Sequence, residues 1–291
     1  MLRLPKFRYH TPETLEEALS LLLRFKRGAS LVAGGTDLFP RLKRREISAK
    51  HVISIRRIET LRRIERIDGH LRIGPAVTHD VLGRVQTLPS PAFDGLQKAC
   101  GSLASPQIRV MGTLGGNICN ASPSADSLPS LLALEAKVEL KGVEGPRSTD
   151  LLDFLKGPFQ TGLGPGEIVT GIRIPLPEVE CVSTYVKLPK ATEKDETLAG
   201  IAVFLEVDRS TGTLGKVRIG MGSVGPTSLR ARRAEAVVEG NRIRKELFEK
   251  AGEIASEEAC PRSRAEYRKE MIRYLVPMAF HNALEKIRIK L

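Results

Sequence analysis

Two short glycine-rich stretches, AGGTD at residues 33–37 and TLGGN at 113–117, constrain this chain more than any other feature. Each combines two glycines with a threonine hydroxyl, and neither fits the G-x-G-x-x-G pattern or the lysine-containing phosphate loop. Glycine reaches positive φ and lets a ligand approach the backbone closely, so such a loop can surround an anion with N–H groups. A tight turn explains either stretch alone equally well. Two stretches of the same chemical style predict that one diphosphate is held from both sides, as in a bound dinucleotide.

The length and composition of the chain suit a soluble protein of one or two domains. Its 291 residues are 41% hydrophobic and 27% charged, within the globular range. No apolar run approaches the ~20 residues that cross a bilayer, and the N-terminus has no apolar signal core, so we expect a cytoplasmic protein. The cysteines are scattered without ligand spacing, which predicts no metal centre held by this chain alone. They are Cys100, Cys119, Cys181 and Cys260.

The formal net charge of +12 raises a second class of function, nucleic-acid binding. The basic residues are spread along the chain, however. Aromatic residues make up only 4% of the sequence and there is no tryptophan, which leaves few platforms for stacked bases. Solvated faces, or docking surfaces for acidic proteins, explain the charge better.

The pattern of the first half predicts a mixture of helices and strands. We expect a first helix that begins at Thr11 with Pro12 at its first position, and a hairpin turn at Asp68 and Gly69. An irregular stretch is expected over 105–127, around the second glycine loop. The first helix is expected to end at Gly28. The other expected helices and strands of this half lie at 30–32, 38–42, 51–55, 64–67, 71–74, 78–82, 93–103, 128–134, 137–141 and 167–174.

Pro175 and Pro177 mark the expected boundary between two domains. Residues 1–176 would form the first domain, with subdomains of about 1–56 and 57–176, and residues 177–291 the second. Beyond the boundary we expect strands at 182–188, 198–207 and 215–222, then helices at 228–239, 244–258 and 263–287. The hydrophobicity of the strand at 198–207 predicts burial on both faces.

Several ordered motifs extend the signal of the glycine loops over nearly the whole chain. They are LVAGGTDL at 31–38, LRIGPAVTH at 71–79, GTLGGNICNASPSAD at 112–126, YVKL at 185–188, VRIGMGSVGPTSLRA at 217–231 and AEYR at 265–268. With these motifs the chain closely resembles the FAD-binding medium subunits of molybdenum hydroxylases, the family of xanthine dehydrogenase and carbon monoxide dehydrogenase.

The resemblance implies an α+β fold. A FAD-binding domain of the vanillyl-alcohol oxidase and p-cresol methylhydroxylase type would be followed by a smaller C-terminal α/β domain that closes over the flavin. The chain would be a flavoprotein oxidoreductase subunit that transfers electrons, without catalytic or metal-binding residues of its own. Its partners would be a small subunit with [2Fe–2S] clusters and a large molybdopterin subunit, where the substrate reacts. The external acceptor would be NAD, a quinone, ferredoxin or oxygen.

The resemblance also implies which residues bind FAD. Both glycine loops would hold the diphosphate, through Val32, Ala33, Gly34, Gly35, Thr36, Asp37, Leu38, Thr113, Leu114, Gly115, Gly116 and Asn117. Asp126 matches an acidic residue near the ribose and adenosine, where a carboxylate can accept from sugar hydroxyls. Tyr185 and Lys187 match positions near the isoalloxazine ring, where a tyrosine shields one face and a lysine favours the reduced flavin. The alternatives are a helix N-cap for Asp126 and a solvent-facing strand for Tyr185 and Lys187.

Three further expectations concern single residues. Thr78 is expected to cap a helix that runs through Val81 and Leu82, and His79 to cap or position it. The chain departs from the family after Lys187, which puts flavin contacts of Lys190 and Asp195 in doubt. A valine at Gly35 or Gly115 is expected to block the phosphates and release the flavin. A self-contained flavin oxidoreductase of the same fold superfamily is the alternative function, and it would need substrate-binding and proton-transfer residues that the sequence does not display.

Overall fold

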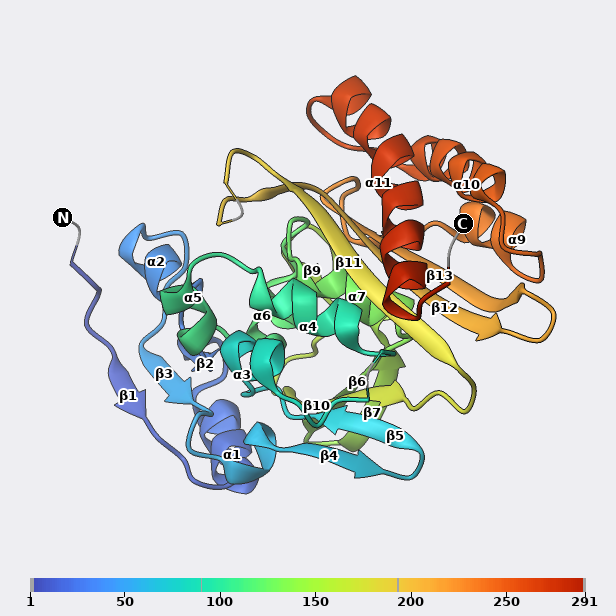
Figure 1. Cartoon of the computed structure of the whole chain (residues 1–291). Helices are drawn as coiled ribbons and strands as arrows, with labels where there is room; N and C mark the ends of the chain where they lie inside the picture. The colour runs from blue at the N-terminus through green and yellow to red at the C-terminus, as the bar shows by residue number, and fades with distance from the viewer. Residues whose placement is uncertain (1–2, 90, 193, 290–291) are drawn as a thin grey trace.

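The computed structural model describes residues 3–89, 91–192 and 194–289, which form three consecutive parts (Figure 1). The first part lies at the lower left of the figure, the second in the middle, and the third, with the last helices, at the upper right. None of the helices in these described ranges has the length and apolarity needed to cross a membrane.

The first part is a small parallel sheet with helices beside it. Its elements are β1 (Arg8–His10), α1 (Leu15–Phe25), the 3₁₀ helix η1 (Lys26–Gly28), β2 (Ala29–Val32), α2 (Leu38–Lys43) and β3 (His51–Ser54). The strand order is β1-β3-β2, and both pairs are parallel. Ala18 of α1 packs with Ile53 of β3 in the core of this part. The strand β2 thereby ends directly before the first glycine loop.

The first helix begins three residues later than the sequence predicts. Its N-cap is Thr14, whose hydroxyl accepts from the N–H of Glu17 at 3.1 Å, while the Glu17 carboxylate accepts from the N–H of Thr14. This reciprocal capping box satisfies two backbone donors at once. The predicted start at Thr11 with Pro12 is therefore wrong. A cap at Thr11 would not allow the reciprocal bonds that Thr14 forms with Glu17.

The second part is an antiparallel sheet covered by short helices. Its strands are β4 (Ile64–Ile67), β5 (His70–Ile73), β6 (Lys137–Gly142), β7 (Gly145–Asp150), β8 (Leu155–Gly157), β9 (Gln160–Thr161) and β10 (Ile168–Pro175). Its helices are η2 (Glu59–Arg62), α3 (His79–Arg84), α4 (Asp94–Gly101), α5 (Pro106–Met111), α6 (Leu114–Asn120), α7 (Ser127–Ala133) and α8 (Leu151–Phe154). The main sheet has the order β4-β5-β10-β6-β7, and β8 pairs with β9 separately.

Two local predictions in this part have different outcomes. The hairpin turn is confirmed, because Asp68 and Gly69 both have positive φ, +49° and +70°, between β4 and β5. The prediction of an irregular stretch over 105–127 is wrong, because this segment contains α5 and α6. Ser105 caps α5 and Thr113 caps α6, so each short helix has a side chain that satisfies its first N–H groups.

The third part combines an antiparallel sheet with three helices. Its elements are β11 (Cys181–Pro189), β12 (Thr197–Asp208), β13 (Thr213–Gly222), β14 (Leu229–Arg230), α9 (Arg232–Val238), α10 (Lys245–Glu258) and α11 (Ala265–Lys286). On β12, Ile201 and Val203 belong to the core shared with the C-terminal helices, whereas Ala202 packs with Ala99 of α4 and Ala133 of α7. Successive side chains of a strand point to opposite faces, so both faces of β12 are covered, as the sequence predicts.

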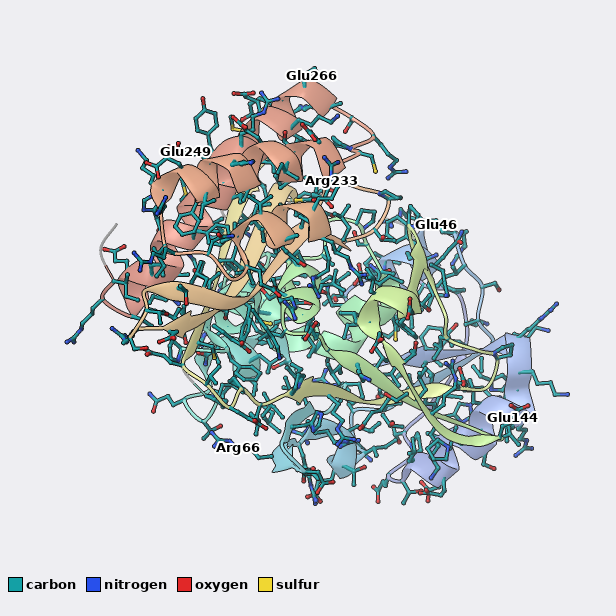
Figure 2. The ribbon with its side chains drawn as sticks, turned by 90° about the vertical axis from the view of Figure 1, so that its right-hand side faces the viewer. Glu46, Arg66, Glu144, Arg233, Glu249 and Glu266 are labelled. Carbon is teal, nitrogen blue, oxygen red and sulfur yellow. The ribbon has the colours of Figure 1, made fainter. Side chains whose placement is uncertain are left out.

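Charged side chains lie over the outside of all three parts. In Figure 2, the labelled residues Glu46, Arg66, Glu144 and Glu266 stand at the periphery on widely separated elements, and Arg233 and Glu249 lie on the neighbouring helices of the third part. The positive charge of the chain is therefore interspersed with acidic side chains around the molecule.

Candidate functional site

The first glycine loop follows β2 and leads into α2. Gly35 has a φ of +75°, a left-handed conformation that glycine adopts without steric cost. A Cβ on Gly34 would lie 2.2 Å from the carbonyl oxygen of Met111, the last residue of α5. One glycine therefore turns the chain, and the other lets this loop approach the segment that leads into the second glycine loop.

The backbone donors of the first loop are unpaired. Within the described ranges, the N–H groups of Gly34, Gly35, Thr36 and Asp37 donate no hydrogen bond. Backbone donors in folded proteins are nearly always paired, so four successive free donors on the wall of a cleft indicate a ligand position. Successive N–H groups of this kind form a concavity that suits an anion such as phosphate.

The second glycine loop is the first turn of α6. Its N-cap is Thr113, whose hydroxyl accepts from the N–H of Gly116 at 3.1 Å. The N–H groups of Leu114 and Gly115 donate to carbonyl oxygens in the segment 75–77, each at 2.9 Å. The donors of this loop thus hold the loop itself in place.

The adjacent glycines of the second loop face different surroundings. A Cβ on Gly115 would lie 2.4 Å from the Cβ of Pro75, inside the protein. A Cβ on Gly116 would meet, among the described residues, only the hydroxyl oxygen of Thr113 within 4 Å, at 3.1 Å. Gly116 also lines the cleft described below. The expected reason for the effect of a valine at Gly115 is therefore wrong, because that side chain would collide with Pro75 rather than with a phosphate.

His79 connects the two loops. Its backbone N–H donates to the carbonyl oxygen of Gly112 at 3.0 Å, and its neighbour Thr78 forms an isolated β-bridge with Thr113. The ring is 2% exposed, and burial lowers the pKa of His79 to about 4, so the imidazole is neutral at physiological pH. The prediction that Thr78 caps this helix is confirmed, because its hydroxyl accepts from the N–H of Val81. His79 is therefore not the cap.

Two cavities meet at the glycine loops. A cleft of about 540 Å³ is lined by both loops, by His79 and Asp126, and by residues 194–197 before and at the start of β12. A mainly apolar cavity of about 900 Å³ lies between α1, β2 and the start of β10. The residues that line both are Leu31, Ala33, Leu38, Gly116 and Cys119. Burial raises the pKa of the Cys119 thiol to about 12, so it remains protonated.

Asp126 is the centre of a buried hydrogen-bond network between the second and third parts. Its carboxylate accepts from the hydroxyls of Tyr185 at 2.7 Å and Thr197 at 2.6 Å, and it forms an ion pair with Lys187 at 3.2 Å. The ammonium of Lys187 also donates to the carbonyl oxygen of Ser102 at 2.7 Å. Burial, with the Asp126 charge as a second cause, holds the pKa of Tyr185 well above its ordinary value. Asp126 has the N-cap position of α7, but its side chain makes no capping hydrogen bond.

The structure brings most of the predicted site residues to the cleft. Those that line it are Val32, Ala33, Gly34, Gly35, Thr36, Asp37, Leu38, Thr113, Gly116, Asn117 and Asp126. Gly115 lines the apolar cavity, while Leu114, Tyr185 and Lys187 line neither. The alternative that Tyr185 and Lys187 face solvent from a strand is wrong, because the Tyr185 ring is 1% exposed and the Lys187 side chain 7%. Their flavin contacts stay predictions.

Arg41 and Thr197 line the cleft and were not predicted from the sequence, whereas Asp195 and Lys190 were residues whose flavin contacts the sequence left in doubt. Arg41 of α2 lines the cleft, and partial desolvation raises the pKa of the nearby Asp37 carboxyl while Arg41 counteracts this. Asp195 lines the cleft and Lys190 does not. Thr197 reaches Asp126 from the third part. Arg41 follows the first loop by one helical turn, and this spacing is the signal that could have identified it.

An α+β fold with a row of free N–H groups where two cavities meet defines a protein that binds a nucleotide cofactor. The family model described as the FAD binding domain in molybdopterin dehydrogenase matches residues 5–177. The model described as the CO dehydrogenase flavoprotein C-terminal domain matches residues 183–283. The chain belongs to this family, the FAD-binding medium subunits of molybdenum hydroxylases, which are flavoprotein oxidoreductase subunits with FAD as cofactor.

Similar proteins cover the chain from end to end. The carbon monoxide dehydrogenase medium chain of Afipia carboxidovorans is 33% identical over 282 residues, 95% of this chain and 96% of that protein. The xanthine dehydrogenase FAD-binding subunit of Escherichia coli O157:H7 is 31% identical over 92% of this chain and 91% of its own.

Solved structures agree with this relationship. A chain of carbon monoxide dehydrogenase from Hydrogenophaga pseudoflava superposes with a TM-score of 0.91 at 32% identity, covering 97% of this chain and 99% of its own. A chain of quinoline 2-oxidoreductase from Pseudomonas putida 86 gives a TM-score of 0.90 at 26% identity, covering 99% of this chain and 100% of its own. The predicted family, fold class and cofactor are thus confirmed.

Proposed function

We propose that this chain passes electrons between the [2Fe–2S] clusters of a partner small subunit and an external acceptor, through FAD bound at the glycine loops. The observation that carries the proposal is the row of unpaired N–H groups at residues 34–37, placed where a polar cleft meets an apolar cavity. When bound, FAD supplies a carrier that accepts single electrons from iron–sulfur centres and hands on two. A large molybdopterin subunit would carry out the chemistry on the organic substrate.

The two cavities suit the two ends of FAD. The adenosine would occupy the apolar cavity, where leucines of α1 and the segment 163–169 offer a surface for a flat base. The ribityl chain and isoalloxazine would occupy the cleft, whose walls carry more hydroxyl and charged groups. The diphosphate would lie between them, against the N–H groups of residues 34–37 and the uncovered face of Gly116.

This arrangement changes the role expected of Asp126. Asp126 lines the cleft and not the apolar cavity, so it would lie at the flavin end rather than near the adenosine. Its carboxylate already accepts from Tyr185 and Thr197 and pairs with Lys187, all in residues 177–291. We propose that this network holds residues 177–291 closed over the flavin as a second domain, with residues 1–176 as the first.

The proposal is tested by isolating the tagged full-length chain with its native partners. We expect a yellow complex with equimolar FAD, in which iron and molybdenum co-purify with the chain and a ferredoxin-like and a molybdopterin-binding subunit are identified by mass spectrometry. Reduction of the complex by its substrate should bleach the flavin absorbance. Metal content tests the proposed partner subunits, and flavin absorbance tests FAD binding and electron transfer. The two parts of the proposal are therefore tested by separate measurements.

The two competing functions predict other results. A self-contained flavin oxidoreductase would be yellow and active without iron or molybdenum. A nucleic-acid-binding protein would be colourless and would bind in a manner that weakens steeply with salt. Either outcome would overturn the electron-transfer proposal.

A further inference from the structure

His79 is a buried polar side chain that the fold does not explain. Its Nδ1 is buried without a hydrogen-bond partner among the described residues, although buried polar atoms are nearly always paired. The ring lines the cleft. Since Thr78 caps α3, helix capping does not account for a histidine at position 79.

The ring lies where the two glycine loops face each other. A Cβ on Gly112 would be 3.3 Å from the Cδ2 of His79 and 3.5 Å from the hydroxyl oxygen of Thr36. Gly112 directly precedes the second loop, and Thr36 belongs to the first. The Cδ2 edge of the ring, which also carries Nε2, is therefore directed toward the place where both loops would meet a ligand.

The surroundings also decide which ring nitrogen carries the proton. No described acceptor lies within hydrogen-bond distance of Nδ1, so a proton there would be buried without a partner. A neutral imidazole has one N–H, and it is then on Nε2. Burial keeps the ring neutral by lowering the pKa of His79 to about 4. His79 thereby presents an uncharged N–H donor at its Cδ2 edge.

We propose that the Nε2–H of His79 donates a hydrogen bond to the diphosphate of FAD, as a side-chain donor beside the free N–H groups of the first loop. This inference rests on the proposed position of FAD at the glycine loops. The diphosphate would then receive donors from both sides: backbone N–H groups of residues 34–37 from one, and the imidazole of His79 from the other. The backbone N–H of His79 anchors this residue to the carbonyl oxygen of Gly112.

Three variants separate a donor at Nε2 from a packing role. In His79→Gln the side-chain amide reaches about as far as Nε2, in His79→Asn only as far as Nδ1, and in His79→Leu there is no donor. Val81→Ala on the exposed face of the same helix is the matched control. The affinity of each full-length apoprotein for FAD is measured by quenching of flavin fluorescence. The ³¹P NMR signals of bound FAD and the unfolding temperature of each apoprotein are recorded alongside.

We expect His79→Leu and His79→Asn to bind FAD about 10- to 100-fold more weakly, the range for one hydrogen bond to a charged group. His79→Gln should stay within about threefold of the wild type, as should Val81→Ala. The ³¹P signals should shift in His79→Leu and not in Val81→Ala. Unchanged affinity and unchanged ³¹P signals in His79→Leu, or equal losses in His79→Gln and His79→Leu, would overturn the inference.

A second measurement covers the case in which His79→Leu does not fold. In wild-type protein with ¹⁵N-labelled histidine, Nε2 of His79 should give the signal of a protonated nitrogen that moves when FAD is added. An unprotonated Nε2 in the FAD complex would contradict the inference. If the wild-type protein itself binds no FAD at the loops, the proposed function fails, which is a different result from FAD binding that is indifferent to His79.

Discussion

The two glycine loops look alike in sequence but use their backbones in opposite ways. In residues 33–37 the N–H groups of Gly34, Gly35, Thr36 and Asp37 are unpaired within the described ranges. In the second loop the N–H groups of residues 114–117 donate to the Thr113 hydroxyl or to carbonyl groups of the protein. The first loop is therefore built to bind an anion, and the second is built to stay rigid beside it.

Within each loop, the two glycines are required for different reasons. Gly34 and Gly115 are glycines because protein atoms lie where a Cβ would be, at 2.2 Å and 2.4 Å. Gly116 has an open face toward the cleft, and Gly35 has the positive φ of the turn. In the first loop a packing requirement is combined with a turn, and in the second with an open face toward the cleft. The two glycine pairs look the same in the sequence, and only their surroundings distinguish these roles.

The largest expected effect concerns the buried hydrogen-bond network of Asp126, which follows the second loop in the sequence. Replacing Asp126 with Ala leaves the ammonium of Lys187 buried without its counter-ion, so we expect the apoprotein to lose about 3–5 kcal/mol of unfolding free energy. Tyr185→Phe, which removes one hydrogen bond to the charged Asp126 carboxylate, should cost less, about 1.5–3 kcal/mol. Urea unfolding measures both. The control is Asp153→Ala, which changes an exposed carboxylate. If Asp126→Ala were as stable as this control, the Asp126 network would not stabilise the apoprotein.

The next effect concerns pH and the residue between the loops. The pKa of His79 falls from 6.5 to about 4 on folding because of burial, so the unfolded chain binds the proton first as the pH drops. The stability that His79 contributes is complete above pH 6.5 and is lost progressively between pH 6.5 and 4, by roughly 3 kcal/mol. Unfolding free energies at a series of pH values measure it. A His79→Leu apoprotein should lack this part of the pH dependence. If the unfolding free energy fell equally steeply between pH 6.5 and 4 in the wild type and in His79→Leu, the contribution of His79 would be disproved.

The adjacent glycines of the second loop offer a sharper comparison. We expect Gly115→Ala to destabilise the apoprotein by about 2 kcal/mol, because its methyl group meets the backbone and ring of Pro75. Gly116→Ala should leave apoprotein stability within about 1 kcal/mol, since alanine favours a helix, and should instead weaken FAD binding. Thermal unfolding without FAD and flavin titration separate the two effects. If Gly115→Ala lost FAD affinity without losing stability, Gly115 would be the glycine that faces the ligand, contrary to the structure.

The smallest expected effect compares the two threonines. Thr113 caps α6 through its hydroxyl, so Thr113→Ala should cost about 1 kcal/mol of apoprotein stability. No capping hydrogen bond is made at the start of α2, where the N-cap is Asp37, so Thr36→Ala should leave the apoprotein stability almost unchanged. Chemical denaturation of both variants is the measurement. Equal losses would mean that the first loop is as self-supporting as the second.

Much of the fold was predictable because its signals are local. The hairpin at Asp68 and Gly69 needs only two residues that tolerate positive φ, and the strand buried on both faces is visible in its continuous hydrophobicity. The start of α1 was misplaced because two threonines competed for one cap, and the second offered a reciprocal bond with Glu17. The helices α5 and α6 were missed because their glycines and short length hide the helical pattern.

The sequence by itself determined the family, the cofactor and the place of both glycine loops, because these follow from residue types at fixed spacing. The tertiary structure decided which donors are free, which glycine faces the cleft, and that Asp126 binds Tyr185, Lys187 and Thr197. Those properties arise from contacts between segments far apart in the chain, such as Gly34 with Met111 and Gly115 with Pro75. Only the folded chain brings these atoms into contact, so no local sequence pattern could have shown these properties.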